Sequence, residues 1–415
     1  MKEIIVYADW QELPSIIKMG VLRAEQVRGE EVFSFEYDEQ WLQSGFAQVL
    51  DPDLRLFTGP QYITDEKPNF GIFLDSSPDR WGRTLMKRRE AFQAREEKRK
   101  ERRLFESDYL LGVNDVSRLG ALRFKLSREG PFLDDDTTFP TPPFSSIREL
   151  EHASLRIEDD DFFEDQQASK WLRLLMAPGS SLGGARPKAS VLSPEGHLWI
   201  AKFPSKNDDK DQGAWELIVN KLAEEAEINM AQGMAKKFSQ KNHTYLTKRF
   251  DRSDKGERIH FASAMTLLGY KDGINHQDGA SYLELVEVLE RYGAQPEEDL
   301  LELWKRIVFS ICVSNTDDHL RNHGFLLTNR GWRLSPAYDI NPNEQGVGLS
   351  LNIDENDNAL DLDLAKSVAE YFRVNLTRAE NFIRSTKKIV NAWRNKADRL
   401  GISKVEQEMM KSAFE

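Results

Sequence analysis

The segment 315–327, NTDDHLRNHGFLL, concentrates side chains that can do chemistry. Asp317 is followed five positions later by Asn322, and a further carboxylate, Asp339, stands in the nearby stretch SPAYDIN. One carboxylate of such a set can accept the proton of an attacking hydroxyl group, while a second carboxylate and an amide oxygen hold Mg²⁺ against phosphates. These residue types therefore predict phosphoryl transfer, with Asp317 as the catalytic base and with Asn322 and Asp339 as metal ligands.

The elements around these residues must bring them together. The stretch 297–314, EEDLLELWKRIVFSICVS, is nearly all apolar after its first turns, which predicts a buried helix. GFLL and WRL flank the turn TNRG, which predicts a two-stranded hairpin between Asn322 and Asp339. A buried helix, an Asp, an Asn, a hairpin and a second Asp follow one another in the catalytic half of protein kinases. In such a loop, His319 is expected to brace the backbone beside the ATP site.

A zinc site is the competing interpretation, because His319 and His323 lie four positions apart. No HExxH frame surrounds the two histidines, and no cysteine lies nearby in the sequence. Mg²⁺ also prefers hard oxygen ligands to imidazole nitrogens. We therefore expect His323 to be a surface or packing residue.

The phosphate-binding half of a kinase is expected upstream. The stretch 179–191, GSSLGGARPKASV, is rich in glycine and enters a predicted hairpin over 189–203, so its backbone amides could cover phosphates. Lys202 is an isolated cation among apolar residues on the second strand, from which a lysine can reach the α- and β-phosphates. Glu216, early in a predicted amphipathic helix over 211–228, is the carboxylate expected to hold it.

The hinge candidate is LTKRFDR, residues 246–252, which follows a short predicted strand. Backbone groups of Lys248 and Phe250 would hold the adenine ring there. The glycine-rich stretch matches neither the GxGxxG loop of ordinary kinases nor a Walker A loop, so the prediction depends on the whole set of motifs.

Composition narrows the class of protein. The chain has 415 residues, of which 40% are hydrophobic and 30% charged, as in ordinary globular proteins. Its single cysteine, Cys312, leaves no internal disulfide and favours a reducing cytoplasm. The sequence has no run of 18 apolar residues and no apolar leader, so neither a membrane span nor secretion is expected. The net charge of −12 disfavours a surface that binds nucleic acid throughout.

The N-terminal part is predicted to be rich in β-structure. EIIVYAD (3–9) and EEVFSFEYD (30–38) alternate as strands do. A helix is predicted from Pro78, with Ser77 as its N-cap, and it runs into a strongly basic stretch over 87–103. That stretch could be a solvated helix with internal ion pairs, or it could contact phosphates or a partner.

Three domains are predicted from these patterns. The prolines and turn formers of DDDTTFPTPPFSS (134–146) mark the first boundary. We expect a β-rich domain over 1–145, a region like a kinase N-lobe over 146–250, and a mainly helical C-lobe over 251–415.

Several motifs together resemble one family, the HipA-type serine/threonine kinase toxins of bacterial toxin–antitoxin modules. The resemblance runs in the family's order from near the N-terminus to about residue 390. The motifs are SPDRWGR (77–83), LLGVNDVSRLGALRF (110–124), GSSLGGARPK (179–188), LTKRFDR (246–252), NTDDHLRNHGF (315–325), LSPAYDI (334–340), LSLNID (349–354) and DLDLAKSVAEYF (361–372).

The resemblance implies an α+β, two-lobed kinase fold with a β-rich N-terminal addition. It also implies ATP and Mg²⁺ as cofactors and transfer of the γ-phosphate to a protein serine or threonine. The family's autophosphorylated serine falls at Ser181, with Ser180 as its neighbour. The ATP contacts that the family and the kinase plan imply are Lys202, Ser181, Gly183, Gly184, Lys248, Phe250, Glu216 and His319.

The family also implies partners. Its members work with a small helix-turn-helix antitoxin, HipB-like here, that binds operator DNA and represses the shared operon. Their protein target is expected to be a translation component such as an aminoacyl-tRNA synthetase. Two alternatives keep the fold: a catalytically weak corepressor within a DNA-bound complex, and a small-molecule phosphotransferase.

One feature departs from the family pattern. A second carboxylate, Asp318, stands beside Asp317. The five-residue spacing to Asn322 assigns the base to Asp317, and Asp318 would instead cap the turn.

Overall fold

The computed structural model of the chain describes residues 1–63, 67–133, 141–159, 162, 167–179, 184–238 and 242–415. They form two compact units, one of residues 1–207 with 248–262 and one of residues 208–247 with 263–415. Helices and strands are mixed throughout, which confirms the predicted α+β class. The two units are coarser than the three predicted domains, which stay a prediction. Among the described residues, no helix is both long and apolar enough to cross a membrane.

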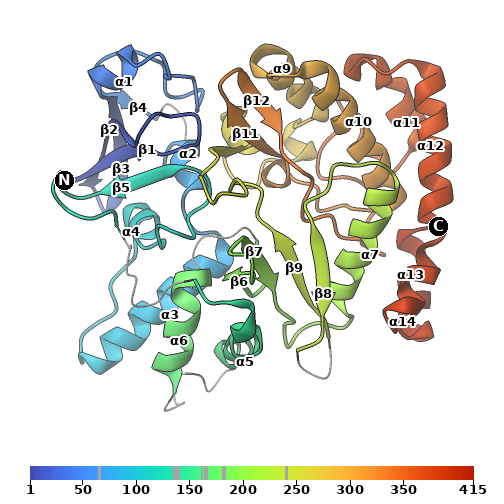
Figure 1. Ribbon diagram of the computed structural model, residues 1–415, viewed down its shortest axis with the longest axis horizontal. Coiled ribbons are helices and arrows are strands. Elements are labelled where there is room, and N and C mark those ends of the chain that lie inside the picture. Colours follow the sequence, from blue (N-terminus) through green and yellow to red (C-terminus); the bar gives the residue numbers. More distant parts are fainter. Residues whose placement is uncertain (64–66, 134–140, 160–161, 163–166, 180–183, 239–241) are drawn as a thin grey trace. The chain divides into compact units, whose positions relative to one another are not determined.

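A five-stranded sheet forms the core of the first unit (Figure 1). Its strand order is β4 (Gln61–Tyr62), β3 (Glu30–Tyr37), β2 (Ile17–Val27), β1 (Lys2–Ala8) and β5 (Leu122–Lys125), and all neighbours are antiparallel. Alternate residues such as Ile4, Val6, Leu22 and Phe35 are fully buried, since one face of the sheet carries the core. Both strands predicted near the N-terminus are therefore confirmed.

The helices of the first unit lie between the strands of this sheet and after them in the chain. The short ones are α1 (Glu39–Gln43), α2 (Gly71–Asp75), α4 (Glu106–Leu111) and the 3₁₀ turn η1 (Phe144–Ser146), and the longer ones are α3 (Arg80–Glu96), α5 (Ile147–Ile157) and α6 (Ala168–Gly179). The hairpin β6 (Lys188–Leu192) and β7 (Leu198–Lys202) pairs antiparallel as predicted, with Lys188 opposite Lys202.

The predicted start of α3 is wrong. Its N-cap is Asp79, whose carboxylate accepts from the Gly82 amide, and the helix begins at Arg80. Ser77 donates its hydroxyl to the Phe73 carbonyl instead. Aspartate caps a helix as well as serine does, and its charge also suits the helix N-terminus. The helix ends at Glu96, so the rest of the basic stretch lies outside it.

The second unit begins with helix α7 (Gln212–Glu225) and the antiparallel pair β8 (Gly233–Lys236) and β9 (Thr244–Lys248). After β10 (Phe261–Ser263) it is mainly helical, as predicted. Its further elements are α8 (Ala264–Leu267), η3 (His276–Asp278), α9 (Tyr282–Tyr292), α10 (Pro296–Cys312), η4 (Leu320–Asn322), β11 (Gly324–Thr328), β12 (Gly331–Leu334), α11 (Leu362–Ser367), η5 (Ala369–Phe372), α12 (Leu376–Val390), α13 (Trp393–Arg399), α14 (Lys404–Met409) and η6 (Lys411–Ala413).

Helix α10 and the β11–β12 hairpin confirm the elements predicted around the acidic segment. Leu303, Trp304 and Ile307 of α10 are fully buried, so the helix forms part of the core of its unit. Residues 313–323 connect α10 to the hairpin, and residues 335–350 follow it. The predicted catalytic residues lie in these two segments.

Candidate functional site

The loop after α10 is tied to the segment that carries Asp339. Asn315 accepts from the Asn341 amide over 3.0 Å through its side-chain oxygen. Farther along, the Asn343 side chain donates to Thr316 Oγ1 over 2.7 Å, and Ser350 donates its hydroxyl to the Thr316 carbonyl over 2.8 Å. Thr316 directly precedes Asp317, so these bonds fix the backbone next to the predicted base.

Asp317 and Asn322 are joined by a local hydrogen bond. Asn322 Nδ2 donates to the Asp317 carbonyl over 2.8 Å, and the His319 amide donates to the same oxygen over 3.0 Å. Asn322 is buried, whereas Asp317 is exposed. Because the amide nitrogen of Asn322 is engaged, its side-chain oxygen is the atom left for a cation.

The adjacent carboxylate, Asp318, has a different environment. It is only 5% exposed, its Oδ2 accepts from the Tyr282 hydroxyl over 2.6 Å, and His323 Nε2 lies 3.1 Å from its Oδ1. Burial acts to raise the pKa of Asp318, but His323 and the Tyr282 hydroxyl outweigh it and leave that pKa below its usual range. Asp318 is thus held within the protein, and Asp317 is the carboxylate of the pair that a substrate can reach.

Asp339 adopts an unusual backbone conformation. Its φ is +56°, in the left-handed region that few non-glycine residues enter. Asn341 Nδ2 donates to Asp339 Oδ1 over 2.9 Å, and the Tyr338 hydroxyl donates to the Arg321 carbonyl over 2.7 Å. Backbone strain of this kind persists where neighbours enforce it, and functional sites are a common place for it.

The residues present fit a bound Mg²⁺. The Asp339 carboxylate and the Asn322 amide oxygen are hard ligands, and phosphate oxygens and water would complete the shell. Among the described residues, no group of three or more His, Cys, Asp or Glu is arranged to hold a metal ion. A site with one or two protein carboxylates that shares its ion with phosphates needs no such group.

Glu216 of α7 belongs to the same neighbourhood. Burial raises the pKa of Tyr245 well above its usual value, and the carboxylates of Glu216 and Asp339 raise it further. Both charges therefore lie close enough to the Tyr245 hydroxyl to disfavour its ionisation. The second unit thus carries Asp317, Asn322, Asp339 and Glu216, whose catalytic and metal-binding roles stay a prediction.

The other predicted nucleotide contacts belong to the first unit. Lys188 and Lys202 face each other across the β6–β7 hairpin, and they are 2% and 9% exposed. Lys188 Nζ lies 3.8 Å from Asp79 Oδ2. A Cβ added to Gly184, whose φ is +87°, would come within 2.9 Å of Lys188 Nζ.

The end of the glycine-rich stretch contacts helix α3. The Trp81 amide donates to the Gly184 carbonyl over 3.3 Å, and Trp81 Nε1 donates to the Lys188 carbonyl over 2.9 Å. Sequence reasoning missed these roles of Asp79 and Trp81, although SPDRWGR stands among the family motifs. Ser180, Ser181 and Gly183 lie outside the described residues.

The hinge candidate has a buried ionic core. Arg249 and Asp251 are almost fully buried and form an ion pair of 2.6 Å, and Arg249 also donates to the carbonyls of Ser117 and Arg118. Lys248 Nζ donates to Asp254 over 2.8 Å. The hinge candidate is therefore held by Arg249 and Asp251, the residues on either side of Phe250. The sequence shows that these residues are charged, but not that they pair with each other.

The C-terminal half of the chain is similar to a family of known proteins. The model of the HipA-like C-terminal domain family matches residues 180–393. A putative kinase of Sinorhizobium fredii, Y4mE, is 26% identical over 182 residues, which cover 39% of this chain and 41% of that protein. A putative kinase of Haemophilus influenzae is 22% identical over 180 residues, which cover 39% of this chain and 52% of that one. The chain thus matches about half or less of the length of these relatives.

One solved structure resembles the chain over nearly its whole length. It is HipA of Shewanella oneidensis, from a complex of the toxin–antitoxin system's HipA and HipB with operator DNA. The TM-score is 0.67 with 17% identity, and the match covers 99% of this chain and 94% of that one. This likeness shows that the two chains share a fold.

Proposed function

The chain belongs to the family with a HipA-like C-terminal domain, and we propose that it is a serine/threonine-protein kinase, the toxin of a toxin–antitoxin module. The observation that carries this proposal is the contrast between two adjacent carboxylates. Asp318 is buried against Tyr282 and His323, whereas Asp317 is exposed on a loop that Asn322 closes. A general base must be accessible to the hydroxyl group that it deprotonates.

Each residue then has a role in the transfer. Asp317 accepts the proton of a serine or threonine hydroxyl, whose oxygen forms the new bond to the γ-phosphorus as the bond to ADP breaks. Asn322 and Asp339 would hold Mg²⁺, which would supply positive charge that neutralises the phosphates. Lys202 would contact the α- and β-phosphates, with Glu216 as the carboxylate that the kinase plan assigns to it, and His319 would brace the loop beside the nucleotide.

The remaining nucleotide contacts come from the glycine-rich stretch and the hinge. Backbone amides at Gly183 and Gly184 would cover the phosphates, and the backbone at Lys248 and Phe250 would hold adenine. Autophosphorylation at Ser181, or at its neighbour Ser180, would add about −1.5 to −2 charges beside the ATP phosphates. Repulsion between like charges would then displace the stretch and switch the kinase off.

The partners that we propose for this chain are those of the similar HipA. Because the similar HipA was solved with HipB and operator DNA, we propose that a HipB-like, DNA-binding antitoxin neutralises this chain and that the two repress their operon together. The net charge of −12 is consistent with a protein that leaves most DNA contacts to its partner. The protein target would be a translation component such as an aminoacyl-tRNA synthetase.

The test is phosphate incorporation. Purified protein is incubated with Mg-ATP and analysed by intact mass and phosphopeptide mapping, alongside the Asp317→Asn variant. We expect one phosphate at Ser181 or Ser180 in the wild type and at least a hundredfold slower incorporation in the variant, because the base is lost. A wild type that neither binds ATP by calorimetry nor gains phosphate would contradict the proposal.

A further inference from the structure

The first turn of α7 is fixed by His243, the residue before β9. Asp211 caps the helix: its Oδ1 accepts from the amides of Ala214 and His243, and its Oδ2 lies 2.6 Å from His243 Nδ1. Asp211 and His243 are both buried. Glu216 lies in this same part of the helix, so whatever holds the first turn also sets the position of Glu216.

A single carboxylate from far along the chain holds the same turn from another side. Glu406 of α14 accepts two hydrogen bonds at one oxygen, from the Asp211 amide and from Trp215 Nε1, each over 2.8 Å. The donors lie one residue before α7 and four positions into it. Trp215 directly precedes Glu216, so Glu406 spans the beginning of the helix up to the residue next to Glu216.

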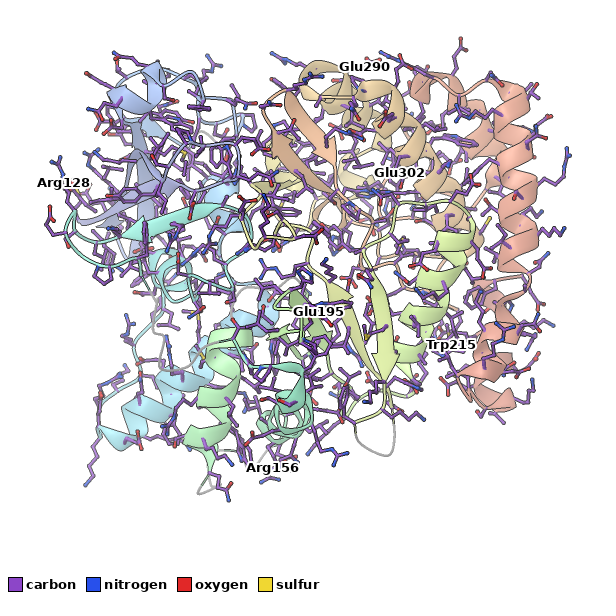
Figure 2. All side chains as sticks on the ribbon, viewed as in Figure 1. Arg128, Arg156, Glu195, Trp215, Glu290 and Glu302 are labelled. Atoms are coloured by element: carbon purple, nitrogen blue, oxygen red, sulfur yellow. The ribbon has the colours of Figure 1, made fainter. Side chains whose placement is uncertain are left out.

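Aromatic packing supports this contact. Trp215 is fully buried, and its ring centroid lies 5.7 Å from that of Trp393 and 5.9 Å from that of Phe414, while Trp393 and Phe414 stack at 4.8 Å. Met410 and Ala413 belong to the same buried cluster. Figure 2 labels Trp215 where α7 faces these C-terminal helices. The segment 403–415 therefore provides a large part of the apolar surface against which α7 packs.

The same segment also reaches the chain beyond Asp339. Ser412 donates its hydroxyl to the Glu344 carbonyl over 2.8 Å, and Lys210, next to the α7 cap, donates to the Glu344 carboxylate over 2.5 Å. Glu344 lies five positions after the predicted metal ligand. Segment 403–415 thus contacts both the helix that carries Glu216 and the segment that follows Asp339.

We infer that the segment 403–415 is an internal clamp that positions α7 for phosphoryl transfer, and that Glu406 is its positioning residue, acting through Glu216. The inference rests on the proposed kinase function. In kinases, the helix that carries this glutamate must be in place for the strand lysine to engage the phosphates. Here the clamp places that helix by contacts within the second unit.

The test compares variants of Glu406 in the full chain. Glu406→Ala removes both hydrogen bonds, Glu406→Gln keeps an acceptor oxygen, and Glu408→Ala is the matched control, because Glu408 is exposed on the same helix and pairs only with surface cations in the described structure. We expect Glu406→Ala to slow autophosphorylation about tenfold and to increase amide exchange over residues 211–216. Glu406→Gln and Glu408→Ala should stay within about twofold of the wild type.

A double-mutant cycle separates positioning from a loss of stability. In a Glu216→Gln background, Glu406→Ala should cost less than about twofold, because the group through which it acts is already altered. An equal loss in both backgrounds, or unchanged exchange over 211–216, would overturn the inference. Glu406→Asp, which is too short to reach both donors, replaces the alanine variant if that one does not fold.

The two proposals can fail separately. If the wild type transfers phosphate, but Glu406→Ala changes neither the rate nor the amide exchange of α7, only the clamp is overturned. A wild type that neither binds ATP nor transfers phosphate overturns the kinase function and, with it, the catalytic role of the clamp.

Discussion

Asp317 and Asp318 show how neighbours in sequence can have opposite physical roles. The buried Asp318 has both oxygens in contact with partners, Tyr282 of α9 and His323 just before β11, whereas Asp317 is exposed. Loss of Asp318 should therefore act on stability and loss of Asp317 on chemistry. Asp318 would thus stabilise the loop, whereas Asp317 would take part in the reaction.

Asp318→Asn tests this at the residue scale. Removing a buried charge from its two partners should lower the free energy of unfolding by about 1–3 kcal/mol. Because the folded pKa of Asp318 lies below its ordinary value, its contribution is present above that ordinary pKa, about 3.9, and is lost as the pH falls through the folded pKa. Urea unfolding of wild type and variant should thus converge in strong acid, and a gap that stays constant with pH would contradict the assignment.

The sequence suggests candidate catalytic residues but not the residues that they contact. Asp317, Asn322 and Asp339 follow from residue type and spacing along a short stretch. The bond between Tyr282 and Asp318 joins residues 36 positions apart, and the bond between Trp215 and Glu406 joins residues 191 positions apart. Spacing carries no information on such pairs, because only the packed chain brings them together.

At the scale of elements, the β6–β7 hairpin offers a matched pair of glycines. Gly184 before it and Gly196 in its turn have φ values of +87° and +83°, but only Gly184 would place a Cβ near Lys188 Nζ. Alanine at either position should cost about 1 kcal/mol of stability through backbone strain. Only Gly184→Ala should also weaken ATP binding, about three- to tenfold by calorimetry. Equal ATP affinities in the two variants would show that Gly184 is not part of the nucleotide site.

Prediction of the elements succeeded where periodicity was strong and failed at a cap. The helices α7 and α10 and the β6–β7 and β11–β12 hairpins match the predicted stretches. The start of α3 does not, because Ser77 and Asp79 are both good caps and only the packed structure shows which one accepts the free amide. Local propensity therefore fixed the type of each element more firmly than its boundary.

At the scale of the whole molecule, the basic stretch over 87–103 stands out against the net charge of −12. Part of the basic stretch over 87–103 is used in ion pairs: Arg99 with Glu90 and Glu97, and Arg103 with Glu30. Lys98 and Lys100 are exposed beyond the end of α3. The paired residues favour a solvated stretch with internal ion pairs, and the exposed lysines favour a contact with phosphates or a partner. An experiment can separate the two interpretations.

Replacing Lys98 and Lys100 by glutamine tests whether this stretch contacts DNA phosphates in the complex with the antitoxin. Each lost phosphate contact should reduce the slope of log K against log salt by about 0.9. Operator binding of the complex is measured at several salt concentrations, with Lys255→Gln, at an exposed turn after the hinge candidate, as a control. A slope that does not change would assign the stretch to solvated ion pairs.

The division of the chain between its two units has a consequence for how the protein is made. The first unit needs residues 248–262, which the chain reaches only after starting the second unit. A nascent chain that stops at residue 207 lacks the Arg249 guanidinium that occupies the carbonyls of Ser117 and Arg118. Because the first unit is completed only by residues 248–262, it should not reach its native state until those residues have left the ribosome. We therefore expect its folding to begin late, when much of the chain has already been synthesised.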